Sequence, residues 1–246
     1  MLNKNVLTAA VAAAVLAGPG FALAQDPGTI TDEGPTHEIS ANVTLATDYT
    51  FRGISQTDEK PAIQGGFDYE HKTGLYVGSW ASNVNFGEGS NSSTEMDFYG
   101  GFAGETDGGL GYDVSYIYFD YRGDSNFDYQ EFGFSLSYVG ATVGVFYSDE
   151  YLGNGGPEFW YPYAQYSTTF FHDDISLDLH YGYSDASDGN KSIEFDGKND
   201  TYSDWSVTLG YSAFGVDFAV AYVDTDLESD FDAGDARAIF SISKSL

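Results

Sequence analysis

The sequence predicts an all-β protein, a transmembrane antiparallel up-and-down β-barrel of about 12 strands that follows an N-terminal signal peptide. Apolar and polar residues alternate along a series of segments, the connections between these segments alternate between short and long, and aromatic residues stand near the ends of the apolar faces. The counts of Tyr, Phe and Gly are high, at 20, 19 and 30, whereas Met is found only 2 times. This composition suits twisted strands and tight turns better than packed helices.

Residues 1–24 are expected to be a cleaved signal peptide. Lys4 provides the positive start, a short apolar run follows, and Ala22-Leu23-Ala24 is a small-x-small cleavage site. A membrane anchor is the weaker interpretation, because a spanning helix needs about 20 apolar residues and Gly18-Pro19-Gly20 interrupts this run. The remaining chain is expected to form a polar periplasmic lead and then the outer-membrane barrel, at residues 25–37 and 38–246.

The first strand is expected to continue as far as Arg52. Tyr49 and Phe51 lie on its apolar face, and Asp48 and Arg52 lie on its polar face, because side chains alternate along a strand. We expect the two aromatic residues to reach an outer interfacial girdle. Gly53 is then expected to release the chain into the first long loop.

The segments that follow repeat this alternation. The strand that begins at Leu75 is the least regular, and its aromatic residues Tyr76 and Trp80 are assigned to the outer face. Pro162 predicts a bulge or irregular pairing, because proline removes one ladder donor. The strands are expected at residues 38–52, 61–71, 75–86, 94–105, 110–121, 128–138, 141–148, 159–168, 175–184, 201–212, 216–223 and 236–246.

The lengths of the connections favour a membrane barrel over a soluble β-sandwich. Every second connection is a short turn, and the intervening ones are longer and more polar. Bacterial outer-membrane barrels have short periplasmic turns, longer outer loops and an even number of strands. A soluble Greek-key sandwich has no reason to separate its connections by length.

Charge, composition and cysteine content disfavour several classes of protein. The chain has 9 basic and 38 acidic residues, a formal net charge of -29, and such a surface repels the phosphates of nucleic acids. The high aromatic content and regular alternation disfavour disorder. Cysteine is absent, and a barrel closed by ladder hydrogen bonds needs no disulfides.

The charged residues of the strands fall on the face opposite the apolar one. A Lys or Arg on the lipid face costs about 2–4 kcal/mol at the bilayer midplane, so these residues are expected to face an acidic lumen. There they would set ion selectivity, with Arg52 as the inward base of the early strands. The expected lumen-lining residues are Asp48, Arg52, Asp68, Glu70, Glu95, Asp97, Asp113, Glu131, Asp178, His180, Asp204 and Asp217.

No catalytic, cofactor or metal site is expected. None of the four histidines lies in a hydrolase or metalloprotease motif, and Asp178 with His180 is better explained as a polar pair in the lumen. The acidic loop 224–235 resembles a calcium loop, but Ser229 stands where the EF-hand turn needs glycine, so a solvated outer loop is favoured and divalent binding stays open. The aromatic run 159–163 is interpreted as girdle or interior filling and less favourably as a sugar or base site.

Three stretches resemble the TorF-type porin family, a group of conserved proteobacterial outer-membrane β-barrel proteins. They are Ala46 to Thr57, Pro61 to Tyr69 and Gly74 to Val84. Beyond them the resemblance is one of layout and continues to the C-terminus. One departure is Leu246 at the end of the chain, where many outer-membrane barrels carry an aromatic residue. The resemblance implies a barrel and a pore, and it implies no catalytic residues.

The favoured function is passive diffusion of small solutes or ions through an outer-membrane porin, with an acidic lumen that prefers cations. One alternative is a non-conducting structural or adhesive barrel whose lumen is filled by inward side chains such as Tyr99, Phe119 and Tyr129. A soluble secreted β-sandwich that binds carbohydrate is a further alternative. The expected partners are outer-membrane lipid, the barrel assembly machinery and small solutes or cations, and the oligomeric state stays open.

Overall fold

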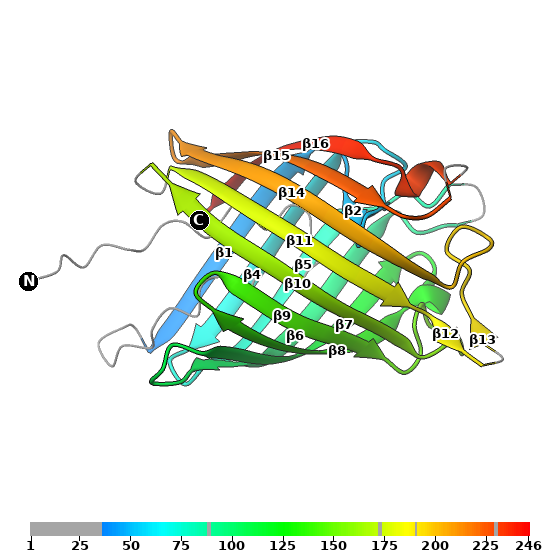
Figure 1. Cartoon of the computed structure of the whole chain (residues 1–246), viewed down its shortest axis with the longest axis horizontal. Helices are drawn as coiled ribbons and strands as arrows, with labels where there is room; N and C mark the ends of the chain where they lie inside the picture. Colours follow the sequence, from blue (N-terminus) through cyan, green and yellow to red (C-terminus); the bar gives the residue numbers. More distant parts are fainter. Residues whose placement is uncertain (1–35, 88–89, 172–173, 190, 229–230) are drawn as a thin grey trace, which may run out of the picture.

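In a computed structural model the chain is a closed antiparallel barrel of twelve strands, which confirms the predicted fold class (Figure 1). The structure describes residues 36–246 except 88–89, 172–173, 190 and 229–230, so the expected signal peptide and most of the lead 25–37 lie outside the described residues. Within the described part, no helix is long and apolar enough to cross a membrane. The barrel strands are β1 (His37–Ala46), β4 (Ala62–His71), β5 (Leu75–Asn83), β6 (Thr94–Glu105), β7 (Gly111–Arg122), β8 (Tyr129–Tyr138), β9 (Ala141–Ser148), β10 (Phe159–Phe170), β11 (Ile175–Asp185), β14 (Thr201–Ala213), β15 (Val216–Thr225) and β16 (Arg237–Ser245).

Each barrel strand pairs with the barrel strand before and after it, and β1 pairs with β16 to close the cylinder. The connections at one end have two to five residues, and those at the other end have six to fifteen. We call these ends the short-turn end and the long-loop end. The long connections carry the small elements β2 (Thr50–Phe51), β3 (Ile54–Ser55), η2 (Ser125–Phe127), β12 (Ser187–Asp188), β13 (Lys191–Ser192) and η3 (Asp232–Gly234). The predicted alternation of short and long connections is confirmed.

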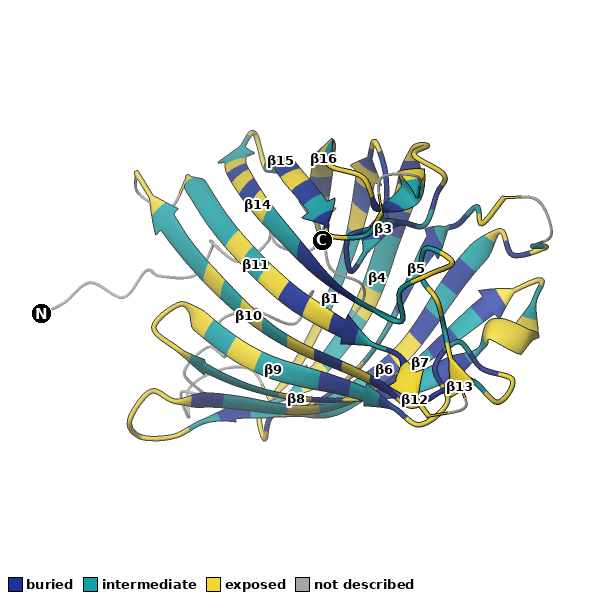
Figure 2. Cartoon of the chain, turned by 45° about the vertical axis from the view of Figure 1, so that its right-hand side comes forward, coloured by how far each residue is buried: buried dark blue, intermediate teal, exposed yellow. Residues whose placement is uncertain are grey.

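The outer wall of the barrel is an apolar belt. Figure 2 shows buried and exposed residues alternating along the strands, as expected when one face points into a barrel and the other points out. Large apolar side chains are exposed on every barrel strand from β4 to β8, and also on β1 and β16. Exposed aromatic rings stand toward both ends, with Trp160, Tyr183 and Tyr222 at the long-loop end and Tyr138 and Tyr211 at the short-turn end.

The assignment of faces in β5 was wrong. Tyr76 and Trp80 are each 7% exposed and face inward, whereas Leu75 and Val77 are 57% and 58% exposed and face outward. The physical reason is that the two aromatic residues have partners inside. The Tyr76 hydroxyl donates to Asp113 at 2.8 Å, and the Trp80 ring packs edge-on against another interior ring.

Pro162 interrupts pairing without adding a residue to the strand. It stands opposite Val145 in the β9–β10 ladder. In the β10–β11 ladder, Trp160 faces Asp185 and Tyr163 faces Gly182, so the register is the same on both sides of the interruption. Of the two expected outcomes, irregular pairing is confirmed and a bulge is absent from this described stretch.

Candidate functional site inside the barrel

The first long connection folds into the barrel and does not extend outward. β1 ends at Ala46, and β2 and β3 form a small hairpin whose turn residues Arg52 and Gly53 have φ angles of 51° and 81°. This two-residue turn favours glycine, and a Cβ on Gly53 would collide with the side chain of Thr225. We call residues 47–57 the inner segment. The predicted continuation of the first strand to Arg52 was therefore wrong.

Tyr49 is the clearest sign of this inward course. Its side chain is 1% exposed, so its predicted place in the outer aromatic girdle was wrong, as was that of Phe51, which packs against the interior ring of Phe119 at 5.8 Å. The Tyr49 hydroxyl donates to Glu95 Oε1 at 3.1 Å, and its ring meets Trp80 edge-on at 5.3 Å. The inner segment thus contacts the wall of the barrel at β5 and β6.

Arg52, at the tip of this hairpin, is buried and paired with a carboxylate across the lumen. Its Nη1 and Nη2 donate to Oε1 and Oε2 of Glu131 at 2.8 and 2.6 Å. The guanidinium carbon also lies 4.3–4.7 Å from the ring centroids of Phe51, Phe159 and Tyr161. A bidentate ion pair within aromatic walls has the geometry in which arginine interacts most strongly.

Asp48 ties the base of the inner segment to the last strand. It accepts hydrogen bonds from Ser55 Oγ at 2.8 Å and Thr57 Oγ1 at 2.6 Å. Its second carboxylate oxygen pairs with Arg237 of β16 at 3.0 Å. In addition, the Tyr202 hydroxyl donates to the backbone carbonyl of Arg52 at 3.0 Å. Bonds from several strands therefore hold the inner segment in one position.

Aromatic side chains fill the space around the inner segment. Phe119 stacks on Tyr129 with centroids 4.5 Å apart, and Tyr151 stacks on Phe159 at 3.9 Å. Tyr129 meets Tyr151 edge-on at 5.1 Å, which joins the two stacks. All four rings are buried. The long-loop half of the lumen is therefore packed with side chains.

The twelve predicted lumen residues divide into two groups. Six of them are buried in the long-loop half, namely Asp48, Arg52, Glu95, Asp97, Glu131 and Asp204. The other five acids lie nearer the short-turn end or on the strands leading to it, namely Asp68, Glu70, Asp113, Asp178 and Asp217. Glu70 is exposed, and the other four are partly exposed, as is His180. The structure thus brings the first group into one packed cluster and leaves the second group along a more open, acidic wall.

Hydroxyl groups donate hydrogen bonds to three acids of the second group, namely Asp68, Asp113 and Asp217. Tyr99 donates to Asp68 at 2.5 Å, and Ser212 donates to Asp217 at 2.5 Å. His180 stands between the two groups, with Nε2 2.7 Å from the Tyr161 hydroxyl and 3.2 Å from Asp204. His180 of β11 thus pairs with Asp204 of the neighbouring strand β14.

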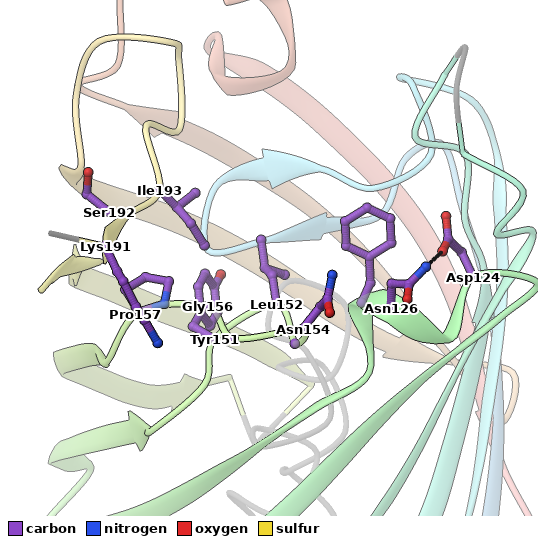
Figure 3. A pocket seen from close by; sticks show the side chains of 13 residues that line it. Asp124, Asn126, Tyr151, Leu152, Asn154, Gly156, Pro157, Lys191, Ser192 and Ile193 are labelled. Carbon is purple, nitrogen blue, oxygen red and sulfur yellow. Dashed lines mark hydrogen bonds between the residues drawn. The ribbon is translucent and has the colours of Figure 1, made fainter.

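A pocket of about 540 Å³ lies at the long-loop end, between three connections (Figure 3). Its apolar part includes Phe127, Leu152 and Ile193, and its polar part includes Asn126, whose Nδ2 donates to Asp124 at 3.2 Å. Tyr151 lines this pocket and also belongs to the aromatic filling of the lumen. The pocket therefore borders the outer surface of the packed half.

Asp196 links the connection before β14 to the connection before β16 at the long-loop end. It accepts hydrogen bonds from the backbone amides of Lys198 and Asn199, and from the amide of Glu228 in the loop before β16 at 3.1 Å. Desolvation of the carboxyl acts to raise its pKa, but a hydrogen bond from the Asn199 side-chain amide at 2.7 Å and the three backbone bonds together hold the pKa of Asp196 well below its usual value.

Because this pKa is lowered, the link should be fully present above the ordinary Asp value of about 3.9 and be lost only as the pH falls through the lower folded-state value. We expect slow hydrogen exchange of the Glu228 amide to persist down to pH 4, and Asp196→Asn to speed that exchange at every pH. Equal exchange in Asp196→Asn and the parent protein would contradict this. Asp200→Asn in the same loop is the control.

In the described residues, the side chains of the acidic loop before β16 do not form a metal-binding site. Across the part of the chain that the structure describes, no group of three His, Cys, Asp or Glu side chains could hold a metal ion. Arg237 instead donates to the carbonyl of Asp232 at 2.6 Å and to the carbonyl of Asp235 at 3.0 Å. Ser229 of the calcium-loop comparison lies outside the described residues.

Sequence reasoning missed three residues of the site. Tyr49 was placed on the lipid side, and neither Tyr202 nor Arg237 was singled out. A usable signal for the inner hairpin was Gly53, since glycine is favoured in a tight two-residue turn. Nothing in the pattern indicated that this hairpin would lie inside.

Solved structures of similar shape are outer-membrane porins. A KdgM porin superposes with a TM-score of 0.52 at 8% identity, covering 84% of this chain and 99% of that chain. A KdgM porin in complex with disordered oligogalacturonate gives 0.51 at 8% identity, with 85% and 98% covered. A NanC porin gives 0.51 at 9% identity, with 84% and 98% covered. At these identities the likeness concerns the fold.

Among curated proteins, none matches this sequence. A family model described as a bacterial protein of unknown function (Gcw_chp) matches residues 31–246, which includes every strand of the barrel. The chain therefore belongs to the Gcw_chp family, and its barrel has the fold of the outer-membrane porins.

Proposed function

We propose that this protein is an outer-membrane porin-type barrel that allows small solutes or ions to diffuse, with a preference for cations. The observation that carries the proposal is a closed twelve-strand barrel with an apolar outer belt and an acidic inner wall. Membership of the TorF-type group, export by a cleaved signal peptide and insertion by the barrel assembly machinery belong to the same proposal. No catalytic role is proposed.

The outer surface supports a membrane location. An exposed apolar surface of this extent is unfavourable in water and favourable in lipid. Closing the sheet also satisfies every strand edge, which a hydrocarbon environment requires. The closed barrel excludes the two-sheet sandwich that was considered as a soluble alternative.

The inner charges support a preference for cations over anions. The predicted lumen residues comprise ten acids against Arg52 and His180, and Arg52 is already neutralised by Glu131. A negative potential in a narrow passage concentrates cations and repels anions. One solved KdgM porin holds oligogalacturonate, an acidic sugar chain, and the acidic inner wall here argues against a similar solute for this protein.

The packed half of the lumen limits what passes. With the inner segment in place, the side chains at its level are buried, so a solute larger than a small ion requires that this segment move. The same packing favours a second candidate, a non-conducting structural barrel, because Phe119 and Tyr129 fill the interior as that alternative expects.

Planar-bilayer recording in a KCl gradient tests both candidates. We expect single-channel steps of small amplitude with a reversal potential that shows cation preference. Asp68→Asn with Asp113→Asn should move that potential toward zero, because both carboxylates are partly exposed on the inner wall. An anion preference would contradict the charge argument, and a complete absence of steps would support the non-conducting barrel. Asp107→Asn, in a short turn outside the lumen, serves as the control.

A further inference from the structure

Two of the five buried acids in the long-loop half have no basic partner. Asp48 pairs with Arg237 at 3.0 Å, Glu131 with Arg52 at 2.6 Å and Asp204 with His180 at 3.2 Å, whereas no described basic side chain pairs with Glu95 or Asp97. The exposed fractions of these two acids are 1% and 0%. An ionised carboxyl buried without a partner is strongly unfavourable, so the pair needs compensation.

The oxygens of this pair are also short of hydrogen bonds. Both carboxylate oxygens of Asp97 and the Oε2 of Glu95 are buried and have no partner among the described residues. Glu95 Oε1 alone accepts a bond, from the hydroxyl of Tyr49. Glu95 and Asp97 stand on the same inward face of β6. They form one site with three unused acceptor positions.

The walls of this site are built from neighbouring strands and the inner segment. Glu95 and Asp97 are two residues apart on the inner face of β6, so their Cα atoms are separated by about 7 Å. Ser82 and Tyr121 stand opposite Glu95 in the flanking strands, and Trp80 and Phe119 stand opposite Asp97. Tyr49 covers the site from the inner segment. Paired carboxylates beside aromatic rings favour a positive charge near them.

From these contacts we infer that Glu95 and Asp97 bind one hard divalent cation of the Ca²⁺ class inside the barrel. Two carboxylates balance the charge of a divalent ion, and carboxylate, hydroxyl and water oxygens are the ligands such ions take. Two carboxylates supply fewer ligands than a calcium ion takes, so we expect an affinity in the range of the weaker calcium sites. Such a site would give the proposed cation preference a structural basis. Binding of the ion does not require conduction, and only a role of the site in transport rests on the proposed function.

Terbium luminescence tests the site without any need for conduction. The protein is refolded into detergent micelles with Tb³⁺, excited through its aromatic residues, and titrated with Ca²⁺ as competitor. Trp80 stands opposite Asp97 in the β5–β6 ladder, which places a sensitising ring beside the site. We expect sensitised emission that Ca²⁺ abolishes, with at least a tenfold loss of Tb³⁺ affinity in Asp97→Asn and in Glu95→Gln.

Asp120→Asn is the matched control. Asp120 lies on the neighbouring strand at the same height, but on the opposite face of the wall, where it pairs with Arg122 at 2.9 Å. This variant should keep the emission of the parent protein. Because Asp97→Asn retains the shape of the side chain, a folded barrel is expected, and a difference in SDS gel mobility between unheated and heated samples checks it.

Three outcomes would overturn the inference. Emission that persists in Asp97→Asn and Glu95→Gln would place the ion elsewhere, for example at the acidic outer loops. Displacement by K⁺ as readily as by Ca²⁺ would make the site monovalent. An absence of emission in the folded protein would mean that the two carboxyls share a proton. None of these results depends on whether the barrel conducts, so loss of the site and loss of the proposed pore are separate findings.

Discussion

Replacing Arg52 with Met is expected to destabilise the folded barrel by about 3–5 kcal/mol, because it leaves the carboxylate of Glu131 buried without its partner. The two hydrogen bonds at 2.8 and 2.6 Å and the surrounding rings are lost together. Urea unfolding of the refolded protein in lipid vesicles, followed by tryptophan fluorescence, measures the change in the free energy of unfolding.

Two further variants make this result specific. Arg122→Met removes an arginine whose side chain is 55% exposed from its pair with Asp120, and it should cost no more than about 1 kcal/mol. The double variant Arg52→Met, Glu131→Leu should recover most of the lost stability, since it removes both buried charges at once. Equal effects of Arg52→Met and Arg122→Met would show that the buried pair does not hold the inner segment.

Arg52 also enters the selectivity of the proposed pore. Its removal leaves Glu131 uncompensated, so Arg52→Ala is expected to raise cation preference in any conducting barrel that still folds. If the reversal potential is unchanged while stability falls, the role of Arg52 is confined to folding.

Removing the inner hairpin is expected to raise the conductance several-fold. The amide of Gln56 donates to the carbonyl of Tyr49 at 2.7 Å, so the ends of the hairpin are adjacent and a short Gly-Ser linker can replace residues 50–55. The linker removes Arg52 and Phe51 from the lumen and opens the space around the buried rings. Single-channel steps and the liposome-swelling rate with neutral sugars of graded size measure the opening.

The matched control shortens a different loop at the same end of the barrel. Ser187 pairs with Ser192 in the β12–β13 hairpin, so removing the residues between them leaves adjacent ends. That hairpin is exposed, and its loss should leave the conductance close to that of the parent protein. Equal steps in all three proteins would show that the inner segment does not limit passage.

Most of the barrel could be predicted from sequence because its causes are local. The period-2 alternation in β11, with Leu177 and Leu179 against Asp178 and His180, depends only on which side each residue points. The lengths of the connections likewise follow directly from the spacing of the alternating segments in the sequence. Neither requires knowledge of a distant contact, and both survive in the structure.

The alternation of apolar and polar residues does not identify the inward face of a strand when both faces are apolar. In β5 both faces are apolar, and the interior took Tyr76 and Trp80 because a tyrosine hydroxyl finds an acceptor in Asp113 there and has none in lipid. Assigning aromatic residues to an outer girdle takes no account of this partner, because Asp113 lies on another strand, β7.

The stretch from residue 47 to 57 separates what sequence determines from what tertiary structure decides. By itself the sequence placed Asp48 and Arg52 away from the apolar face and a break in the strand pattern at Gly53. The tertiary structure alone decided that the turn lies within the lumen, because Glu95, Glu131 and Arg237, the partners of Tyr49, Arg52 and Asp48, are 46 or more residues distant from them in the chain. Such long-range ion pairs and hydrogen bonds leave no period in the sequence, yet they determine where the inner segment lies and what the barrel admits.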